Sequence, residues 1–355
     1  MRRYRNVVAQ TIHYFSRPHT HVRRTPILGP AAWRGSEISK NSGWIESLSP
    51  TEINEIEASL RVAHSIGHPS ESLSKLDFPL PKLAPRIDSW RKQLNSGRGF
   101  VVLRGLPIER WSSEEAELFF WCFGLHLGIP GTQNREGHQL GHVRDLGVSP
   151  DSPEVRLYKT SAEIRYHCDA ADVVGLLCIK QAQEGGRSRI VSSVSVYNEL
   201  LRRRPDLVAL LYQSFELDTR GEGGIDHYPV PACRYAGGTL RTFYHSDYFR
   251  SAPRYDDVPP LSRSRLALLN LYDEIANSEA LYLEMDLEPG DIQLVSNHSV
   301  IHARTAYTDS PTKQRHLLRL WLSLPHARSK LDKLLTQAER LRILASFAKM
   351  KWNNR

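Results

Sequence analysis

The chain has 355 residues, of which 40% are hydrophobic and 24% are charged, and its formal net charge is +8. These values are typical of a folded globular protein and exclude a chain that is mainly disordered. No apolar stretch reaches the ~18 residues that a transmembrane helix needs. The four cysteines are spread along the chain without a CxxC pair, which argues against a structural zinc site and against a disulfide framework.

Much of the positive charge lies at the N-terminus, where the first 36 residues contain seven arginines and no acidic residue. This composition is typical of a mitochondrial transit peptide, and the alternative is an extension that is disordered or packed on the surface. We therefore expect a basic N-terminal extension over residues 1–28 and a single domain over residues 29–355. The expected compartment is the cytoplasm, with the mitochondrion as the alternative. No other basic run is interleaved with aromatic residues, so we expect neither nucleic acid nor a membrane as a partner.

Three helices are expected in the N-terminal half. The stretch SPTEINEIEASLRVA has Ser49 or Thr51 as a helix N-cap, acidic residues in its first turns and apolar residues on one face. A second helical pattern, IDSWRKQLN, is broken at Gly97 and followed by the strand GFVVLRG. A third, SSEEAELFFWCFGLHLG, starts with a serine and glutamate cluster and ends at Gly128.

Short apolar segments separated by turn residues follow Tyr158, which is typical of a sandwich or a jelly-roll barrel. A helix over 262–276 interrupts them, and one or two helices over 327–352 close the chain. The expected fold is mixed α/β and mainly β: a double-stranded β-helix core, jelly-roll and cupin-like, buttressed by N- and C-terminal helices. The strand segments are VVGLLCIKQAQEGG, SRIVSSVSVYNELL, GTLRTFY, LYLEMDLEPGDIQLVSNHSVIHARTAYTD and RHLLRLWLSL.

The stretch YHCDAADVVGLLC is the first that suggests chemistry, because His167 and Asp169 stand two residues apart at the start of an apolar run. Residues i and i+2 of an extended strand point to the same face. The pair can therefore offer an imidazole nitrogen and a carboxylate oxygen to one metal ion. Two histidines and one carboxylate form the facial triad of non-haem Fe(II) oxygenases. Taken alone, such a pair is more often a core histidine and a turn aspartate.

A third ligand is available downstream, in LEPGDIQLVSNHSVIHARTAYTD, which contains His298 and His302. Arg315 follows thirteen residues after His302, and Arg319 lies four residues later. A basic side chain near the metal could hold a dicarboxylate through a bidentate guanidinium fork. Chance would rarely place these residue types in this order.

The motifs YHCDAADVVGLLC, GGRS, EPGDIQLVSNHSVIHARTAYTD and RHLLRLWLSLP together resemble the taurine dioxygenase-like family of Fe(II)- and 2-oxoglutarate-dependent oxygenases. The resemblance extends from about Gly29 to Pro325 and implies Fe(II), 2-oxoglutarate as cosubstrate, and O2.

The resemblance also implies the iron ligands, which are His167, Asp169 and His302. His302 is preferred to His298 because the family's distal histidine directly precedes a segment like ARTAYTD, and because the spacing from His302 to Arg315 fits the family better. Halogenating relatives lack the carboxylate ligand and leave its position to chloride, so Asp169 argues for oxygenation.

The family's cosubstrate contacts are carried over to three residues. Arg315 is expected to pair with the distal carboxylate of 2-oxoglutarate. Ser188, in GGRS, stands where the family usually carries a threonine hydroxyl that contacts the same carboxylate. Arg319 is expected to bind the cosubstrate or an acid group of the substrate, and its alternative is a strand residue that pairs with a surface carboxylate.

Two polar positions are candidates for contact with the substrate. Glu163, four residues before His167, could pair with an ammonium group, and its alternative is a solvent-facing strand residue. Asn134 belongs, with Gln133 and Arg144, to GTQNREGHQLGHVRD, a polar loop of the kind that covers an active site.

An aromatic segment, RTFYHSDYFRSA, is the third candidate. Its Tyr244, with Phe243, His245 and Tyr248, could wall the pocket, and the alternative is barrel core and a surface turn. Cys168 should point to the opposite face from the two ligands, so we expect it to pack and not to bind the metal.

The expected function is an Fe(II)/2-oxoglutarate-dependent oxygenase. It would couple oxidative decarboxylation of 2-oxoglutarate to oxidation of a C–H bond, with hydroxylation favoured, in a small carboxylate- or amino-acid-like substrate. The first alternative keeps the iron site but desaturates or cyclises the substrate. A remote alternative is a non-catalytic binding protein on the same barrel, because a fold does not imply a function. The sequence predicts no oligomeric state.

Overall fold

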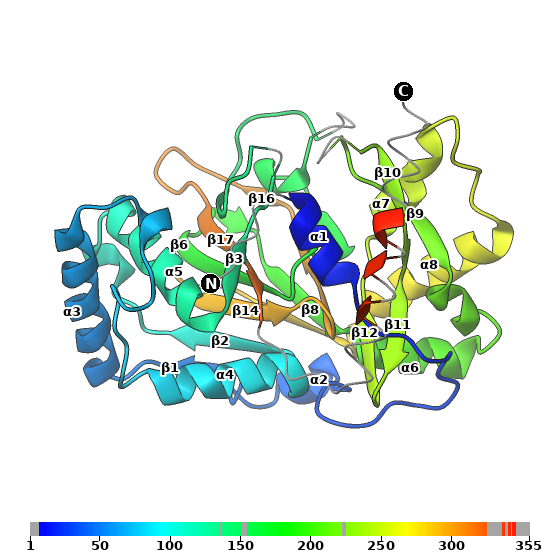
Figure 1. Ribbon diagram of the computed structural model, residues 1–355, viewed down its shortest axis with the longest axis horizontal. Coiled ribbons are helices and arrows are strands. Elements are labelled where there is room, and N and C mark those ends of the chain that lie inside the picture. Colours follow the sequence, from blue (N-terminus) through cyan, green and yellow to red (C-terminus); the bar gives the residue numbers. More distant parts are fainter. Residues whose placement is uncertain are drawn as a thin grey trace.

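The computed structural model of the chain contains two β-sheets that face each other across a shared apolar core (Figure 1). The structure describes residues 7–134, 136–150, 155–221, 225–324, 336–337, 340–341 and 343–345. The larger sheet has the order β1 (Ile45–Ser47), β2 (Phe100–Arg104), β14 (Ile292–Ser296), β6 (Val173–Lys180), β17 (His316–Ser323) and β3 (Ile129–Gly131), with β4 (Leu140–Val143) also paired to β17. The smaller sheet has the order β13 (Tyr282–Met285), β8 (Ser188–Ser192), β15 (Val300–Arg304) and β5 (Ile164–His167).

The core between the sheets takes side chains from both. Phe100, Val174 and Trp321 come from the larger sheet, and Ile190 and Val300 come from the smaller one. Removal of these apolar side chains from water favours the stacking of the two sheets. The prediction of a mixed α/β fold built around β-sheets is confirmed.

Three helices cover the outer face of the larger sheet: α3 (Pro50–Ile66), α4 (Ala84–Ser96) and α5 (Ser113–Leu127). The three predicted helices are therefore confirmed. Ser49 and Ser112 are the N-caps of α3 and α5, and each forms a capping box with the glutamate three residues later. Gly97 and Gly128 are the C-cap residues of α4 and α5.

A second helical layer packs on the other side of the smaller sheet, with α6 (Ser193–Arg203) and α8 (Arg263–Ala276). The helix predicted over 262–276 is confirmed, and Ser262 is its N-cap. The same side carries the hairpins β9 (Ser214–Asp218) with β10 (His227–Pro231) and β11 (Cys233–Ala236) with β12 (Thr239–Thr242), and the short helix α7 (Ser246–Ser251). The remaining elements are α2 (Gly35–Ile38), the pair β7 (Glu184–Gly185) and β16 (Tyr307–Thr308), and 3-10 turns at Ser70–Ser72, Ile108–Arg110, Leu157–Lys159, Val208–Tyr212 and Ala252–Arg254.

One predicted strand is partly wrong. The segment SRIVSSVSVYNELL forms a strand only as far as Ser192 and then becomes helix α6. The hydroxyl of Ser192 accepts a hydrogen bond from the N–H of Ser195 and caps this helix. Buried Val194, Tyr197 and Leu201 recur every three to four residues, so helical periodicity prevails over strand propensity here.

The two ends of the chain are described to different extents. Helix α1 (Val7–Phe15) packs against the core, and its Tyr14 and Phe15 are buried in the same cluster as side chains of α6 and α8. The helices predicted over 327–352 lie outside the described residues, apart from the helical residues 336–337, 340–341 and 343–345. Among the helices that the structure describes, none is long and apolar enough to cross a membrane.

Candidate active site

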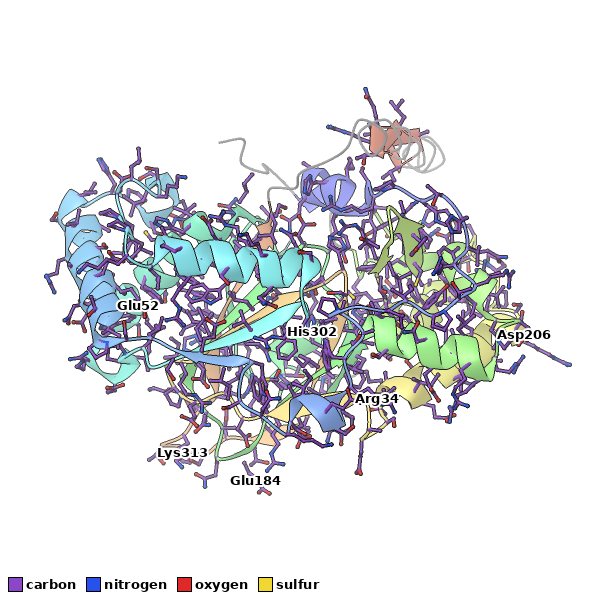
Figure 2. All side chains as sticks on the ribbon, turned by 90° about the horizontal axis from the view of Figure 1, so that it is seen from below. Arg34, Glu52, Glu184, Asp206, His302 and Lys313 are labelled. Atoms are coloured by element: carbon purple, nitrogen blue, oxygen red, sulfur yellow. The ribbon has the colours of Figure 1, made fainter. Side chains whose placement is uncertain are left out.

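Two histidines stand opposite each other on neighbouring strands of the smaller sheet. His167 is the last residue of β5, His302 lies in β15, and the antiparallel register pairs them directly. Their ring centroids are 4.2 Å apart. Figure 2 labels His302 near the centre of the molecule, whereas Arg34 and Lys313 lie at its rim. The strand register therefore brings together residues that are far apart in the sequence.

Asp169 completes the group, although it does not lie on the same strand. Strand β5 ends at His167 and β6 begins at Val173, so the expectation that one extended strand carries both ligands is wrong. The loop between the strands returns the carboxylate to the histidines. One ligand atom from each of His167, Asp169 and His302 lies within 4.8 Å of the others. This group could hold one metal ion.

The carboxylate of Asp169 is buried and poised for a cation. Its Oδ2 lies 3.6 Å from Nε2 of His302 and has no hydrogen-bond partner among the described residues. Burial acts to raise the pKa of Asp169, but the guanidinium of Arg319 and, to a smaller extent, the imidazoles of His302 and His167 oppose this, and the pKa lies below its ordinary value. A buried carboxylate oxygen that stays ionised without a donor fits a bound metal ion.

The two imidazoles are in the form that a metal requires. Nδ1 of His167 donates to the carbonyl oxygen of Arg165 at 2.9 Å. The proton therefore lies on Nδ1, and the lone pair of Nε2 is available to a metal ion. Burial lowers the pKa of His167, and it lowers the pKa of His302 to about 3. Both side chains are therefore neutral near pH 7 and able to bind a cation.

The other histidine of the downstream motif, His298, has a different environment. Its Nε2 lies 2.8 Å from Oδ1 of Asp172, and its ring stacks on Tyr14 with centroids 4.7 Å apart. Cys168 is buried, and its Sγ lies 3.8 Å from the carbonyl oxygen of Val300. Neither His298 nor Cys168 belongs to the group that could hold a metal.

An inner cavity leads from the three ligands into the space between the sheets, and Ser188, Gln293, Arg304 and Arg315 line it. Arg315, just before β17, is 6% exposed. Its Nη2 donates to the carbonyl oxygen of Gly186 at 3.3 Å, and its Nη1 is buried with no hydrogen-bond partner among the described residues. Burial lowers the pKa of Arg315, although a guanidinium remains charged in proteins. An open, buried guanidinium donor fits an acidic ligand.

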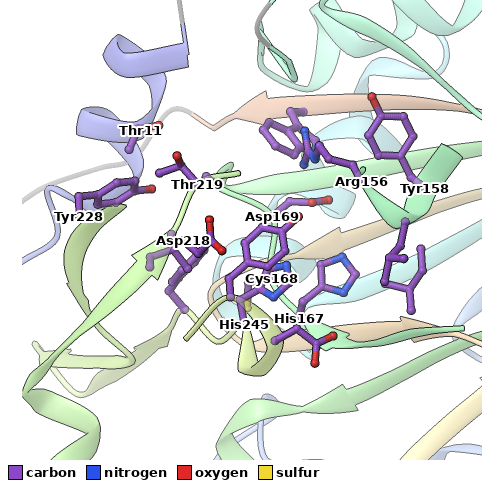
Figure 3. Close-up of a pocket in the computed structure, with 18 of the residues that line it drawn as sticks. Thr11, Arg156, Tyr158, His167, Cys168, Asp169, Asp218, Thr219, Tyr228 and His245 are labelled. Carbon is purple, nitrogen blue, oxygen red and sulfur yellow. The ribbon is translucent and has the colours of Figure 1, made fainter. Parts of the chain in front are cut away.

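An outer cavity adjoins the same group, and the two cavities share His167, Asp169 and Arg319. Its walls come from the loop before β5, the hairpin β9–β10, α7 and the N-terminal helix α1. Figure 3 shows Arg156 and Tyr158 to one side of His167 and Asp169, and Thr11, Asp218, Thr219 and Tyr228 to the other.

Two arginines lie together in this outer cavity. Nη1 of Arg156 donates to the backbone carbonyl of Gln133 at 2.6 Å, and Nε of Arg319 donates to the side-chain Oε1 of Gln133 at 2.6 Å. Both guanidinium groups lie over the rings of Tyr158 and Trp321. The guanidinium carbon of Arg156 is 5.2 Å from the ring centre of Tyr158 and 5.6 Å from that of Trp321. The corresponding distances for Arg319 are 4.5 and 5.1 Å. The result is a concentration of positive charge beside the three ligands.

The structure does not bring the three predicted substrate residues to either cavity wall. Glu163 is exposed. Asn134 makes local hydrogen bonds with His138, at 2.9 Å to its N–H and 3.0 Å to its ring. Tyr244 is fully buried and donates to Oδ1 of Asp273 at 2.6 Å. Its neighbours do line the outer cavity: Phe243, His245 and Tyr248.

Arg156, Gln293 and Arg304 are among the cavity residues that the sequence did not predict. Arg304 stands two residues after His302 on the same strand, so strand periodicity was an available signal. Gln293 donates from Nε2 to the hydroxyl of Ser188 at 2.9 Å, and this contact spans 105 residues of sequence. Arg156 lies in a loop without a periodic pattern, and only the fold brings it near Arg319.

The whole chain also has recognisable relatives. The family model described as "Taurine catabolism dioxygenase TauD, TfdA family" matches residues 62–321. The chain belongs to this family. It is therefore an Fe(II)- and 2-oxoglutarate-dependent non-haem iron oxygenase, and the predicted family, enzyme class and cofactors are confirmed.

Two relatives of the TauD, TfdA family cover most of the chain. The FR-33289 synthase of Streptomyces rubellomurinus is 31% identical over 327 residues, which are 86% of this chain and 93% of that protein. The taurine hydroxylase-like protein SAT17 of Stachybotrys chartarum is 29% identical over 304 residues, which are 81% of this chain and 77% of that protein.

Solved structures support the fold. Asparagine oxygenase in complex with Fe(II), 3-hydroxyasparagine and succinate has a TM-score of 0.64 and 17% identity, and the match covers 79% of this chain and 93% of that one. The non-haem iron oxygenase OrfP in complex with Fe and α-ketoglutaric acid has a TM-score of 0.57 and 15% identity, over 79% and 93% of the two chains. The two facing sheets are thus the double-stranded β-helix of this fold.

The geometry predicts that Asp169→Ala weakens Fe(II) binding at least about 100-fold. Loss of a residue that only hydrogen-bonds to a metal ligand already weakens metal binding by up to about 100-fold, and loss of the ligand itself should cost at least as much. Anaerobic titration calorimetry with Fe(II) measures the affinity. Cys168→Ala is the matched control next along the chain, and it should bind Fe(II) as the parent protein does. Equal affinity in Asp169→Ala and the parent would rule out Asp169 as a ligand.

Proposed function

We propose that the chain binds Fe(II) through His167, Asp169 and His302, binds 2-oxoglutarate in the inner cavity, and hydroxylates a small carboxylate- or amino-acid-like substrate in the outer cavity. The observation that carries the proposal is that the two cavities meet at His167 and Asp169, and that the inner one also contains His302 and the buried guanidinium of Arg315. When bound, Fe(II) supplies the oxygen activation that couples loss of CO2 from 2-oxoglutarate to oxidation of a C–H bond.

The lining of the inner cavity suits the charge of the cosubstrate. We assign Arg315 to the distal carboxylate, because its Nη1 is buried without a partner among the described residues. Ser188 adds a hydroxyl that Gln293 orients. Arg304 adds a second positive group, since its Nε and Nη1 are also buried without partners among the described residues. A dicarboxylate would offset the cost of burying these cations.

We expect Arg315→Gln to raise KM for 2-oxoglutarate by about 30-fold or more, because loss of one partner of a buried charge pair costs about 2–5 kcal/mol. The readout is Fe(II)-dependent succinate formation over a range of 2-oxoglutarate concentrations. Arg187→Gln is the control, since Arg187 is next to Ser188 in the sequence but is 54% exposed and pairs with Glu284. An unchanged KM in Arg315→Gln would remove this residue from the cosubstrate site.

The outer cavity favours a substrate with an acid group. Two of its acidic lining residues already have partners: Asp218 pairs with Arg254 at 2.9 Å, and Asp247 lies 3.4 Å from Arg165. The guanidinium groups of Arg156 and Arg319 lie together in the lining of this cavity, over the rings of Tyr158 and Trp321. We infer that these two residues bind a carboxylate or a similar anion at one end of the substrate.

Amino acids are a suitable substrate class because they carry such a carboxylate. Asparagine oxygenase has been solved with 3-hydroxyasparagine, and OrfP with hydroxylated arginine. These structures support a search among amino acids and related small acids. Glu163, which was predicted to pair with an ammonium group, does not line the outer cavity, so acids without an amino group belong in the same search.

We expect Arg156→Gln to lower the substrate-stimulated rate of 2-oxoglutarate consumption at least about tenfold at subsaturating acid substrate, by raising KM. The slow, substrate-independent succinate formation should change less than twofold, because Arg156 lines the outer cavity and not the inner one. A screen of amino acids and small acids supplies the substrate for this comparison. A tenfold fall in both rates would place Arg156 in the cosubstrate site instead.

Mass analysis of the product separates hydroxylation from the alternative reactions. Hydroxylation adds one oxygen atom, whereas desaturation or cyclisation removes two hydrogens. The product with one added oxygen supports the proposal, and the loss of two hydrogens would replace hydroxylation by the alternative. The cytoplasmic compartment stays a prediction.

A further inference from the structure

The N-terminal segment Gln10–Arg17 reaches the loop that carries Asp169. Although this basic segment was predicted to be an extension outside the domain, Gln10, Tyr14 and Arg17 are each no more than 3% exposed. They contact the loop between β5 and β6 and the turn between β14 and β15. Such burial of a predicted extension calls for a role in the site.

The first contact pairs the buried carboxylate of Asp172 with the guanidinium of Arg17. Asp172 is 1% exposed, and its carboxylate forms an ion pair with the buried guanidinium of Arg17. Asp172 also accepts a hydrogen bond from the N–H of Leu324 at 2.9 Å and lies 2.8 Å from Nε2 of His298. A buried carboxylate is costly unless it is paired, so Arg17 stabilises the end of the loop three residues beyond Asp169.

The second contact passes through Asn297. Oδ1 of Asn297 accepts the N–H of Asp169 at 3.1 Å, and its Nδ2 donates to the carbonyl oxygen of Ala171 at 3.0 Å. The hydroxyl of Tyr14 donates to the backbone carbonyl of Asn297 at 2.8 Å. Nε2 of Gln10 donates to the carbonyl oxygen of Ala170 at 3.5 Å. The loop is therefore held by Asn297 on one side and by the N-terminal segment on the other.

The third contact is with the outer cavity. Thr11 lines this cavity together with His167 and Asp169. Ile12, next to it, packs against Ile225, which is another cavity residue. Figure 3 shows Thr11 and Tyr228 across the cavity from Arg156 and Tyr158. The same segment thus touches the ligand loop and closes one side of the substrate space.

We infer that the segment Gln10–Arg17 positions Asp169 for metal binding, through the pair Arg17–Asp172 and the hydrogen bond from Tyr14 to Asn297. This inference rests on the proposed function, because it assigns the metal to Asp169. It moves the working boundary of the catalytic domain from residue 29 to residue 10 or earlier. Arg17 and Tyr14 are positioning residues, since they act on Asp169 through other groups and touch neither substrate nor cofactor.

Arg17→Ala and Arg17→Lys test the ion pair in the full chain. We expect Arg17→Ala to weaken Fe(II) binding about 10- to 100-fold, as is typical for loss of a contact that orients a metal ligand. Arg17→Lys should recover most of the affinity, because it keeps the charge. Arg24→Ala is the matched control, as Arg24 belongs to the same basic segment but is exposed. Anaerobic calorimetry gives the Fe(II) affinity, and far-ultraviolet circular dichroism reports whether each apoprotein is folded.

Tyr14→Phe keeps the inference testable if Arg17→Ala does not fold. It deletes one oxygen and keeps the ring that stacks on His298. We expect its Fe(II) affinity to fall at least threefold while the apoprotein stays folded. Parent-like affinity in a folded Arg17→Ala, or in Tyr14→Phe, would overturn the inference. Absence of Fe(II) binding in the parent protein would instead overturn the proposed function, so the two failures are distinguishable.

Discussion

The antiparallel register between β5 and β15 is the constraint on which the site depends. It sets His167 directly opposite His302, so both imidazoles project from one face of the smaller sheet. A slip of one residue would turn one imidazole to the other face and abolish the site. The apolar clusters on both sides of the smaller sheet oppose such a slip, because Ile190 and Val300 pack toward the larger sheet while Ile301 packs toward α6 and α8.

The charged groups around His167, Asp169 and His302 suit a site that binds a metal ion and acidic ligands. A buried carboxylate, two neutral imidazoles and several largely buried arginines lie within one region of the protein. Buried guanidinium groups destabilise an empty protein unless anions compensate them. Asp169 compensates Arg319 in part, at 3.9 Å, and a dicarboxylate beside Arg315 would do the same in the inner cavity. The arginines of the two cavities therefore favour acidic ligands on both sides of one metal ion.

The sequence predicted the outline of the fold and site better than their details. The capping residues Ser49 and Ser112 are local signals in the sequence, and they were sufficient to predict where α3 and α5 begin. The grouping of His167, Asp169 and His302, which could hold a metal ion, was predicted because the order and spacing of these residues and Arg315 resemble a family motif. The position of Asp169 in a loop, and the contacts of Arg156, arise from tertiary packing that no local pattern contains. The contacts of the N-terminal segment were not predictable for the same reason, since its arginine composition does not reveal that Asp172 is the partner of Arg17.

The most direct test of the account is anomalous scattering at the iron edge from anaerobic crystals of the full chain with Fe(II) and 2-oxoglutarate. The account predicts one strong peak about 2 Å from Nε2 of His167, Nε2 of His302 and a carboxylate oxygen of Asp169. It also predicts density for the cosubstrate that extends from this peak to Arg315. An iron peak at another group of residues, or cosubstrate density outside the inner cavity, would contradict the account.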